Sequence, residues 1–311
     1  MVESRPDTGA HVSDPLLPAI RLLREAGDPS PRRTAATLAS HVTGQDENAC
    51  LIGRCSPLSA EQTAQLTDLC RRRSAGEPLQ YLTGTAWFMG DAYAVGPGVL
   101  VPRPDSEILV LEALKRRGEA DPAAVSPLRF ADLCTGTGCV GLSFARELDK
   151  TGTSYEGLLT DLSDEALPYA TVNLQALAPR GPVRIVQADL LPDGGDRFDL
   201  ILSNPPYIPS ADIAGLMPEV SIHEPRSALD GGADGLVFYR RLASIAPARL
   251  AEGGWLLVEH GFDQGEAVRE LFRNTACFDT VESVRDLGGH ERVTAARRGY
   301  DAADTPDPVR D

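Results

Sequence analysis

The sequence lacks the patterns that mark several specialised classes of protein. Its six cysteines form no Cys-x-x-Cys pair, which argues against a zinc knuckle or a thiol redox motif. No run of about 18 apolar residues occurs, so no membrane span is predicted. The N-terminal stretch MVESRPDTGAHVSDP has no apolar core of the kind that secretion signals contain. We therefore expect a cytoplasmic protein with reduced thiols.

The sequence also lacks basic charge. It has 30 Lys and Arg residues against 45 Asp and Glu residues, which gives a formal net charge of −15. Duplex-DNA binders usually carry a basic face, because phosphate neutralisation supplies most of their affinity. We expect a monomer that acts on a small molecule or a protein and contacts neither nucleic acid nor a membrane. The length of 311 residues allows one large domain and a smaller one.

Composition divides the chain into five segments. Two polar tails rich in Pro, Asp and Gly are expected to be disordered. Between them we expect a helical domain, a hairpin connector punctuated by Gly and Pro, and a larger domain. The predicted boundaries are 1–14 for the first tail, 15–80 for the helical domain, 81–104 for the connector, 105–298 for the larger domain and 299–311 for the second tail. Within the helical domain, Ser59 and Gln62 form a capping-box pattern that predicts the start of a helix.

Strand and helix patterns alternate along the larger domain. Strands are predicted at 128–133, 157–160, 183–187, 198–203 and 255–259, helices at 105–117, 139–148, 164–177, 236–250 and 265–273, a long loop over 204–234, and a hairpin that joins 280–285 to 292–297. Such alternation implies an α/β fold in which a mostly parallel, Rossmann-like sheet has helices on both faces.

A glycine turn between the first strand and its helix predicts a ligand-binding loop. Gly136 and Gly138 allow a close backbone approach, and the N-terminus of the following helix offers free N–H groups. Asp161 follows the second strand, where a carboxylate can accept both ribose hydroxyls of a nucleoside. The pattern Gly136-x-Gly138-x-x-Gly141 also fits a dinucleotide-binding turn, so the turn alone does not decide which nucleoside binds.

Two further carboxylates narrow the choice of nucleoside. Asp132 lies three residues before Thr135 and Gly136, an arrangement that favours an S-adenosylmethionine loop in which the acid meets the amino group of the ligand. Asp189 follows the third strand, where it can accept an N–H of the adenine amino group.

We find no spacing typical of metal ligands in the sequence and predict no metal site.

The segment Ser203-Asn-Pro-Pro-Tyr207 carries the chemistry that the sequence predicts. It follows a parallel strand, at the edge where open α/β sheets bind ligands. An amide or aromatic-amine nitrogen is a poor nucleophile because its lone pair is delocalised. The Asn204 side-chain oxygen and the Pro205 carbonyl can accept its two N–H groups, Pro206 stiffens the turn, and Tyr207 can stack on the planar group.

Nine segments of the sequence together match the pattern of one protein family: residues 77–84, 87–90, 100–107, 204–207, 219–220, 224–235, 259–266, 285–286 and 291–293. Through these segments the chain resembles the release factor glutamine methyltransferase family over roughly residues 30–298. It implies a class I methyltransferase sheet of seven strands, the last antiparallel, with a smaller N-terminal helical domain that docks the protein substrate. It also implies N5-methylation of the glutamine in the Gly-Gly-Gln motif of peptide-chain release factors.

The resemblance assigns roles to individual residues. S-adenosyl-L-methionine, with S-adenosyl-L-homocysteine as product, would be bound by residues of the glycine turn and of three strand ends: Asp132, Thr135, Gly136, Thr137, Gly138, Asp161, Asp189, Leu190 and Asn204. Asn204, Pro205 and Tyr207 would be catalytic. Together with Pro206 they would hold the glutamine, with Arg103 and Glu107 near the cleft.

Three positions depart from the family pattern. Cys134 stands where the family usually has Gly, and a Cys fits there only if its φ is negative. Ser106 follows Asp105 where Thr is commoner, and Leu190 replaces what is sometimes an aromatic residue. None of these changes removes a reacting group.

His260, which precedes a glycine at a strand end, is interpreted as a packed or solvent-bonded side chain.

Other functions fit parts of the sequence. An adenine-N6 methyltransferase of nucleic acid would use nearly the same chemistry, but the acidic charge opposes it. An NAD-dependent oxidoreductase fits the glycine turn but leaves Asn204 and Tyr207 without a role. A non-enzymatic cofactor-binding module would not need the methyl-acceptor motif. A ribosomal-protein glutamine and a small-molecule amide stay open as acceptors.

Overall fold

The computed structural model describes residues 14–119, 127–286 and 288–300. The chain forms two compact units that divide between Thr83 and Gly84. Of the two predicted disordered tails, residues 1–13 and 301–311 lie outside the described residues. Among the described residues, no helix is both long enough and apolar enough to cross a membrane.

The N-terminal unit is helical. Its helices are α1 (Leu17–Glu25), α2 (Pro31–Thr43), α3 (Glu47–Leu51), α4 (Ala60–Ser74) and α5 (Leu79–Thr83). They enclose a core of their own, in which Leu16, Leu38 and Leu66 are buried. The predicted capping box is confirmed, because the Ser59 hydroxyl accepts from the Gln62 backbone and the Gln62 side chain accepts from the Ser59 backbone.

The second unit begins with a hairpin and continues as an alternating α/β fold. The hairpin strands are β1 (Thr85–Phe88) and β2 (Asp91–Ala94). The strands that follow are β3 (Leu128–Leu133), β4 (Tyr155–Asp161), β5 (Val183–Gln187), β6 (Phe198–Ser203), β7 (Leu250–Glu259), β8 (Phe278–Arg285) and β9 (Glu291–Arg298). The helices are α6 (Glu107–Glu119), α7 (Cys139–Thr151), α8 (Leu167–Leu177), α9 (Pro218–Ser221), α10 (Val237–Arg249) and α11 (Gly265–Arg273), with short 3₁₀ turns η1 (Pro104–Ser106), η2 (Ile213–Gly215) and η3 (Arg226–Ala228).

The seven-stranded sheet has the order β5-β4-β3-β6-β7-β9-β8. Its strands from β5 to β7 are parallel, and β9 pairs antiparallel with both β7 and β8. The predicted fold, a Rossmann-like class I methyltransferase sheet whose last strand is antiparallel, is therefore confirmed.

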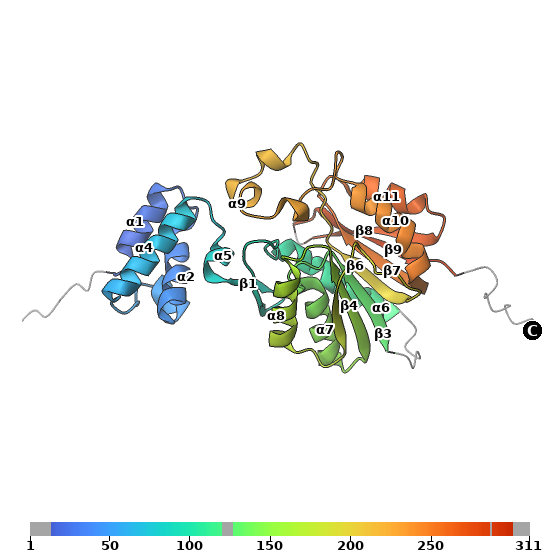
Figure 1. The fold of residues 1–311 in the computed structure, drawn as a ribbon, viewed down its shortest axis with the longest axis horizontal. Coiled ribbons are helices and arrows are strands. Elements are labelled where there is room, and N and C mark those ends of the chain that lie inside the picture. Colours follow the sequence, from blue (N-terminus) through green and yellow to red (C-terminus); the bar gives the residue numbers. More distant parts are fainter. Residues whose placement is uncertain (1–13, 120–126, 287, 301–311) are drawn as a thin grey trace, which may run out of the picture. The chain divides into compact units, whose positions relative to one another are not determined.

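Helices cover both faces of this sheet, which explains why its strands read as nearly continuous apolar runs. Helices α6, α7 and α8 lie on one face, and α10 and α11 lie on the other (Figure 1). Successive residues of β6 alternate between the two cores: Leu200 and Leu202 pack toward α6 and α7, whereas Ile201 packs toward α10.

Two stretches differ from the sequence-based prediction. Strand β7 begins at Leu250 rather than at residue 255, and its pairing with β6 shifts register between Phe198 and Leu200. The Gly253-Gly254 pair lies inside the strand, with φ +72° at Gly253. The predicted loop over 204–234 contains the short elements η2, α9 and η3, which are too brief to show a periodic pattern.

The parallel arrangement brings the predicted site residues to one edge of the sheet. Cys134, Asp161, Asp189 and Asn204 lie at or just after the carboxyl ends of β3, β4, β5 and β6, four neighbouring strands. Open α/β sheets bind their ligands along this edge.

Candidate active site

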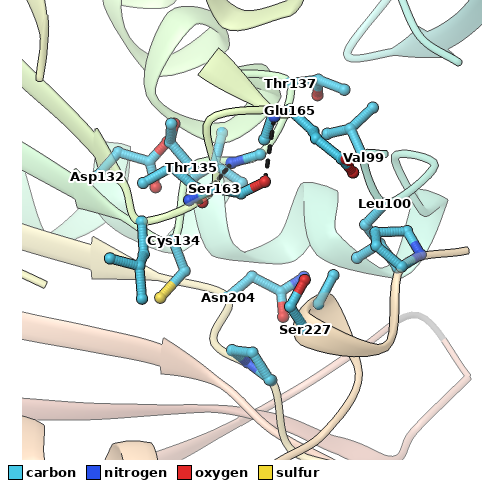
Figure 2. A pocket seen from close by; sticks show the side chains of 18 of the residues that line it. Val99, Leu100, Asp132, Cys134, Thr135, Thr137, Ser163, Glu165, Asn204 and Ser227 are labelled. Carbon is cyan, nitrogen blue, oxygen red and sulfur yellow. Dashed lines mark hydrogen bonds between the residues drawn. The ribbon is translucent and has the colours of Figure 1, made fainter. Parts of the chain in front are cut away.

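A cavity of about 440 Å³ lies at this edge of the sheet. Its volume falls within the range typical of small-molecule sites, about 300–1,000 Å³. The predicted residues that line it are Arg103, Asp132, Thr135, Gly136, Thr137, Asp161, Asp189, Leu190, Asn204 and Pro206. Figure 2 shows Asn204 and Cys134 at this cavity together with Thr135 and Ser163 of the surrounding loops.

Four predicted residues are not among those that line the cavity: Gly138, Pro205, Tyr207 and Glu107. Gly138 caps helix α7 with a φ of +81°. The Tyr207 ring packs against the core beneath α10, and its carbonyl accepts a bond of 2.8 Å from Gln264. The Glu107 carboxylate accepts a bond of 2.8 Å from the Met89 backbone, which ties α6 to the β1–β2 hairpin.

Asp132 organises the glycine turn from beneath. Its side chain is almost fully buried, and its Oδ2 accepts from the Thr135 hydroxyl at 2.5 Å and from the Gly141 backbone at 2.9 Å. Desolvation raises the pKa of this carboxyl to about 7, although both hydrogen bonds act in the opposite direction. Asp132 thus fixes the shape of the turn in addition to lining the cavity.

Asp161 connects two loops at the end of β4. Its Oδ2 accepts from the Gly136 backbone at 2.8 Å, and its Oδ1 accepts from the Ser163 backbone at 2.9 Å. Each carboxylate oxygen retains a further lone pair for a ligand hydroxyl. Burial raises the pKa of Asp161, while these backbone bonds counteract the shift.

Helix α10 supplies cavity residues that sequence reasoning missed. Phe238 and Arg241 line the cavity, and the Arg241 guanidinium pairs with Asp189 at 2.8 Å. The two residues are three positions apart, so they share a helix face. That spacing is a signal in the sequence, but the pairing with Asp189 depends on how α10 packs on the sheet.

Asn204 is held by a residue from a distant part of the chain. Its amide nitrogen donates to the Ser106 hydroxyl at 3.1 Å, and Ser106 itself is 2 % exposed. An amide nitrogen only donates and an amide oxygen only accepts. Asn204 can therefore accept a hydrogen bond through its oxygen while Ser106 binds its nitrogen.

Arg103 binds the loop that follows β6. Its guanidinium donates to both oxygens of Glu224 at 2.6 and 2.7 Å. The Glu224 side chain is fully buried. The pair therefore fastens the 204–236 loop to the segment before η1, and both Arg103 and the neighbouring Pro225 line the cavity.

Family models match both units. The PrmC N-terminal domain matches residues 16–84, and the methyltransferase small domain matches residues 109–242. The release factor glutamine methyltransferase of Geobacter sulfurreducens is 40 % identical over 89 % of this chain and 93 % of its own length. That of Bordetella pertussis is 43 % identical over 85 % of this chain and 94 % of its own.

The chain belongs to the release factor glutamine methyltransferase family.

A solved structure supports the fold of this family member. The catalytic domain of hMettl16, in complex with the MAT2A 3′UTR hairpin 6, has a TM-score of 0.53 and 18 % identity, and it covers 77 % of this chain and 84 % of that chain. At this identity the likeness concerns the fold. Together, the relatives and the matched domain identify the chain as a methyltransferase enzyme.

One expectation about the family pattern is wrong. A negative φ was required for Cys134 to replace the usual Gly, but Cys134 has a φ of +57°. It follows directly after β3, and its side chain packs against the α10 side of the sheet. This left-handed backbone costs about 1–2 kcal/mol for a residue with a Cβ.

The two other departures keep their surroundings intact. Ser106 retains the hydroxyl that Thr would supply, and this hydroxyl binds Asn204. Leu190 is 3 % exposed with a φ of +67°, and its carbonyl accepts from the Thr160 hydroxyl at 2.5 Å.

His260 is fully buried, and its Nδ1 lies 2.9 Å from the Gly261 carbonyl, in line with a packed histidine. Among the described residues, no cluster of three or more His, Cys, Asp or Glu side chains could hold a metal ion.

Proposed function

We propose that this enzyme methylates the side-chain amide nitrogen N5 of the glutamine in the Gly-Gly-Gln motif of peptide-chain release factors, with S-adenosyl-L-methionine as methyl donor. The observation that carries the proposal is the placement of Asn204, which lines the cavity while its amide nitrogen is bound to Ser106. The names of the relatives, which are release factor glutamine methyltransferases, support the choice of acceptor.

The cavity fits the proposed methyl donor. Its volume of about 440 Å³ suits a nucleoside with an amino-acid tail. Asp161 would accept the ribose hydroxyls, and Asp189 would accept the adenine amino group. The turn from Thr135 to Gly138 would bind the remainder, with the α7 N-terminus beneath it and Asp132 and Leu190 at its sides. When bound, S-adenosyl-L-methionine supplies a methyl group attached to a positively charged sulfur.

The residues after β6 would hold the acceptor. The Asn204 oxygen would accept one N–H of the glutamine amide, and the Pro205 carbonyl would accept the other. Pro206, which lines the cavity, would hold the planar amide in place, and Tyr207 would support this segment from the core against which its ring packs. These acceptors orient the nitrogen and bind it more strongly as it becomes positive, which lowers the barrier rather than strengthening ground-state binding.

This mechanism requires no dedicated general base. Once it carried a fourth substituent, the amide nitrogen would be strongly acidic and would release its proton to water. The roles of Arg103 and Glu107 would be indirect, because Arg103 fastens the loop through Glu224 and Glu107 fastens the β1–β2 hairpin.

We propose that three segments of the chain have different roles. Residues 15–80 would form the helical domain that docks the release factor, residues 81–104 the hairpin connector, and residues 105–298 the methyltransferase domain, in a monomeric enzyme. The match of residues 16–84 to an N-terminal domain model of the same family supports this division.

A transfer assay with several acceptor classes tests the proposal. Methyl-labelled S-adenosyl-L-methionine is supplied with a release factor, with ribosomal proteins, with adenine-containing nucleic acid or with a small amide. We expect rapid labelling of the release factor alone. Preferential labelling of another acceptor would reject the release-factor assignment, and absence of cofactor binding in calorimetry would reject the proposed methyl donor.

A further inference from the structure

A buried glutamate lies directly beside Asn204 at the carboxyl edge of the sheet. In the parallel register of β6 and β7, Ser203 pairs with Val258, so Asn204 and Glu259 follow as neighbours. Side chains alternate along a strand, and Leu257 packs toward α6 and α7. Glu259 therefore points to the face covered by α6 and α7, where Ser106 ends η1 just before α6.

Glu259, Ser106 and Asn204 lie together at this edge. The Ser106 and Asn204 side chains both lower the pKa of the Glu259 carboxyl, which places their donor groups close to its carboxylate. The Ser106 hydroxyl has a single proton, and it accepts from the Asn204 amide nitrogen at 3.1 Å. One N–H group of the Asn204 amide is therefore bound to Ser106, and the second is left for the neighbouring Glu259 carboxylate.

The burial of Glu259 is costly for a purely structural residue. Glu259 is 2 % exposed, and its Oε2 has no hydrogen-bond partner in the described part of the chain. Replacement of a buried, incompletely paired carboxylate by an apolar side chain is often neutral or stabilising. A carboxylate at this position therefore suggests a requirement other than stability.

We propose that Glu259 is a positioning residue that fixes the orientation of the Asn204 carboxamide. This inference rests on the proposed function, in which the Asn204 oxygen accepts an N–H of the acceptor amide. A carboxylate can only accept hydrogen bonds, so it draws the Asn204 nitrogen inward and leaves the oxygen facing the cavity. A rotated amide would place its own N–H groups against those of the acceptor. Glu259 is not among the residues that line the cavity, so it acts through Asn204.

This arrangement holds while Glu259 is ionised. Desolvation raises the pKa of Glu259 to about 7, and the hydrogen bonds from Ser106 and Asn204 lower it. The charged and titratable groups that face the carboxylate are Arg292 of β9, which also lowers its pKa, Asp105 of η1, which raises it, and Tyr207, Tyr239 of α10 and Cys139 of α7. A protonated Glu259 can donate to the Asn204 oxygen and would allow the rotated amide.

A double-mutant cycle separates positioning from general stability. Glu259→Gln keeps the shape of the side chain but can donate, so it should lower kcat by at least about tenfold and leave the dissociation constant of the methyl donor within about twofold. If Glu259 acts through Asn204, then kcat of the Asn204→Ala/Glu259→Gln double variant should match that of Asn204→Ala alone. A multiplicative loss in the double variant would overturn the proposal.

Glu112→Gln is the matched control. Glu112 is a buried glutamate of α6 that pairs with Arg116 at 2.6 Å and is not among the residues that line the cavity. Any effect of Glu112→Gln on kcat should therefore multiply with that of Asn204→Ala. A non-multiplicative result for this control as well would show that the cycle reports general destabilisation, and it would overturn the interpretation.

A measurement without turnover distinguishes failure of this inference from failure of the proposed function. In ¹⁵N-labelled protein, the side-chain amide signals of Asn204 are assigned by their loss in Asn204→Ala. We expect them to shift with pH with a midpoint near the pKa of Glu259, about 7, and to lose this shift in Glu259→Gln. An unchanged titration in Glu259→Gln would overturn the positioning role, whatever acceptor the enzyme methylates.

Discussion

Asn204 and Asp161 are the two residues whose proposed roles separate most cleanly. Asn204 lines the cavity just after β6 and is bound to Ser106, whereas Asp161 connects the glycine turn to the loop after β4. Asn204→Ala should lower kcat by about 10²-fold or more and leave binding of the methyl donor nearly intact, because it removes a hydrogen bond made mainly in the transition state. Asp161→Ala should instead weaken donor binding by about tenfold or more, because it removes charge-assisted hydrogen bonds.

Calorimetry and steady-state kinetics on the two variants check this prediction, and each variant is the control for the other. Unchanged turnover in Asn204→Ala would remove Asn204 from the mechanism. Unchanged donor affinity in Asp161→Ala would remove Asp161 from the ribose site.

Cys134 allows a test of backbone strain at a single residue. Its φ is +57°. Any residue with a Cβ is strained at this angle, whereas glycine is not. Cys134→Gly should therefore be more stable than Cys134→Ala by about 1 kcal/mol, the reverse of the usual order in regular structure. Urea unfolding of the two variants measures the difference directly. A more stable alanine variant would mean that the left-handed conformation is not strained here.

At the scale of elements, the strands and helices of the sheet could be predicted, whereas the contacts between loops could not. Apolar runs at 128–133 and 198–203 coincide with β3 and β6, because a parallel sheet is buried on both faces. The 204–236 loop shows no hydrophobic periodicity. Its short elements and the attachment of Glu224 to Arg103 are therefore known only from the structure.

The same reasoning applies to the candidate site. The residues at strand ends, such as Asp161 and Asn204, could be predicted because parallel strands end at one edge. The residues that hold them could not. Ser106 binds Asn204 across 98 positions, and Arg241 reaches Asp189 from a helix whose packing the sequence does not specify.

The Arg103–Glu224 pair should stabilise the loop that it fastens. Arg103→Met removes the guanidinium from a fully buried carboxylate and should lower the free energy of unfolding by about 1–3 kcal/mol, less than for a fully buried pair because Arg103 is partly exposed. Urea unfolding checks this value. The Arg103→Met/Glu224→Met double variant should recover part of the loss, since no unpaired charge stays buried. A double variant less stable than Arg103→Met would contradict this account of the loop.

At the scale of the whole molecule, buried carboxyls make stability depend on pH. The pKa of Asp132 is raised from 3.8 to about 7, so the folded protein binds this proton more tightly than the unfolded chain. The stability that Asp132 contributes is therefore complete below about pH 4 and is lost as the pH rises through about 7. At about 1.4 kcal/mol per pKa unit, the change from 3.8 to about 7 sets an upper limit of about 4 kcal/mol.

Asp132→Asn removes this titration while it keeps an acceptor for Thr135 and Gly141. The free energy of unfolding of the variant relative to wild type should therefore increase as the pH rises from 5 to 8, because the wild type alone must bury a charge at high pH. Urea unfolding at several pH values measures the difference. A difference that is independent of pH would show that Asp132 is not protonated in this range.

The central claim is that the enzyme methylates one glutamine of a release factor, and site-specific labelling tests it most directly. The enzyme is incubated with methyl-labelled S-adenosyl-L-methionine and a release factor whose Gly-Gly-Gln glutamine is either intact or replaced by alanine. The account predicts label in the intact factor alone, located on that glutamine by mass spectrometry. Equal label in both factors, or no label from an enzyme that binds the methyl donor, would contradict it.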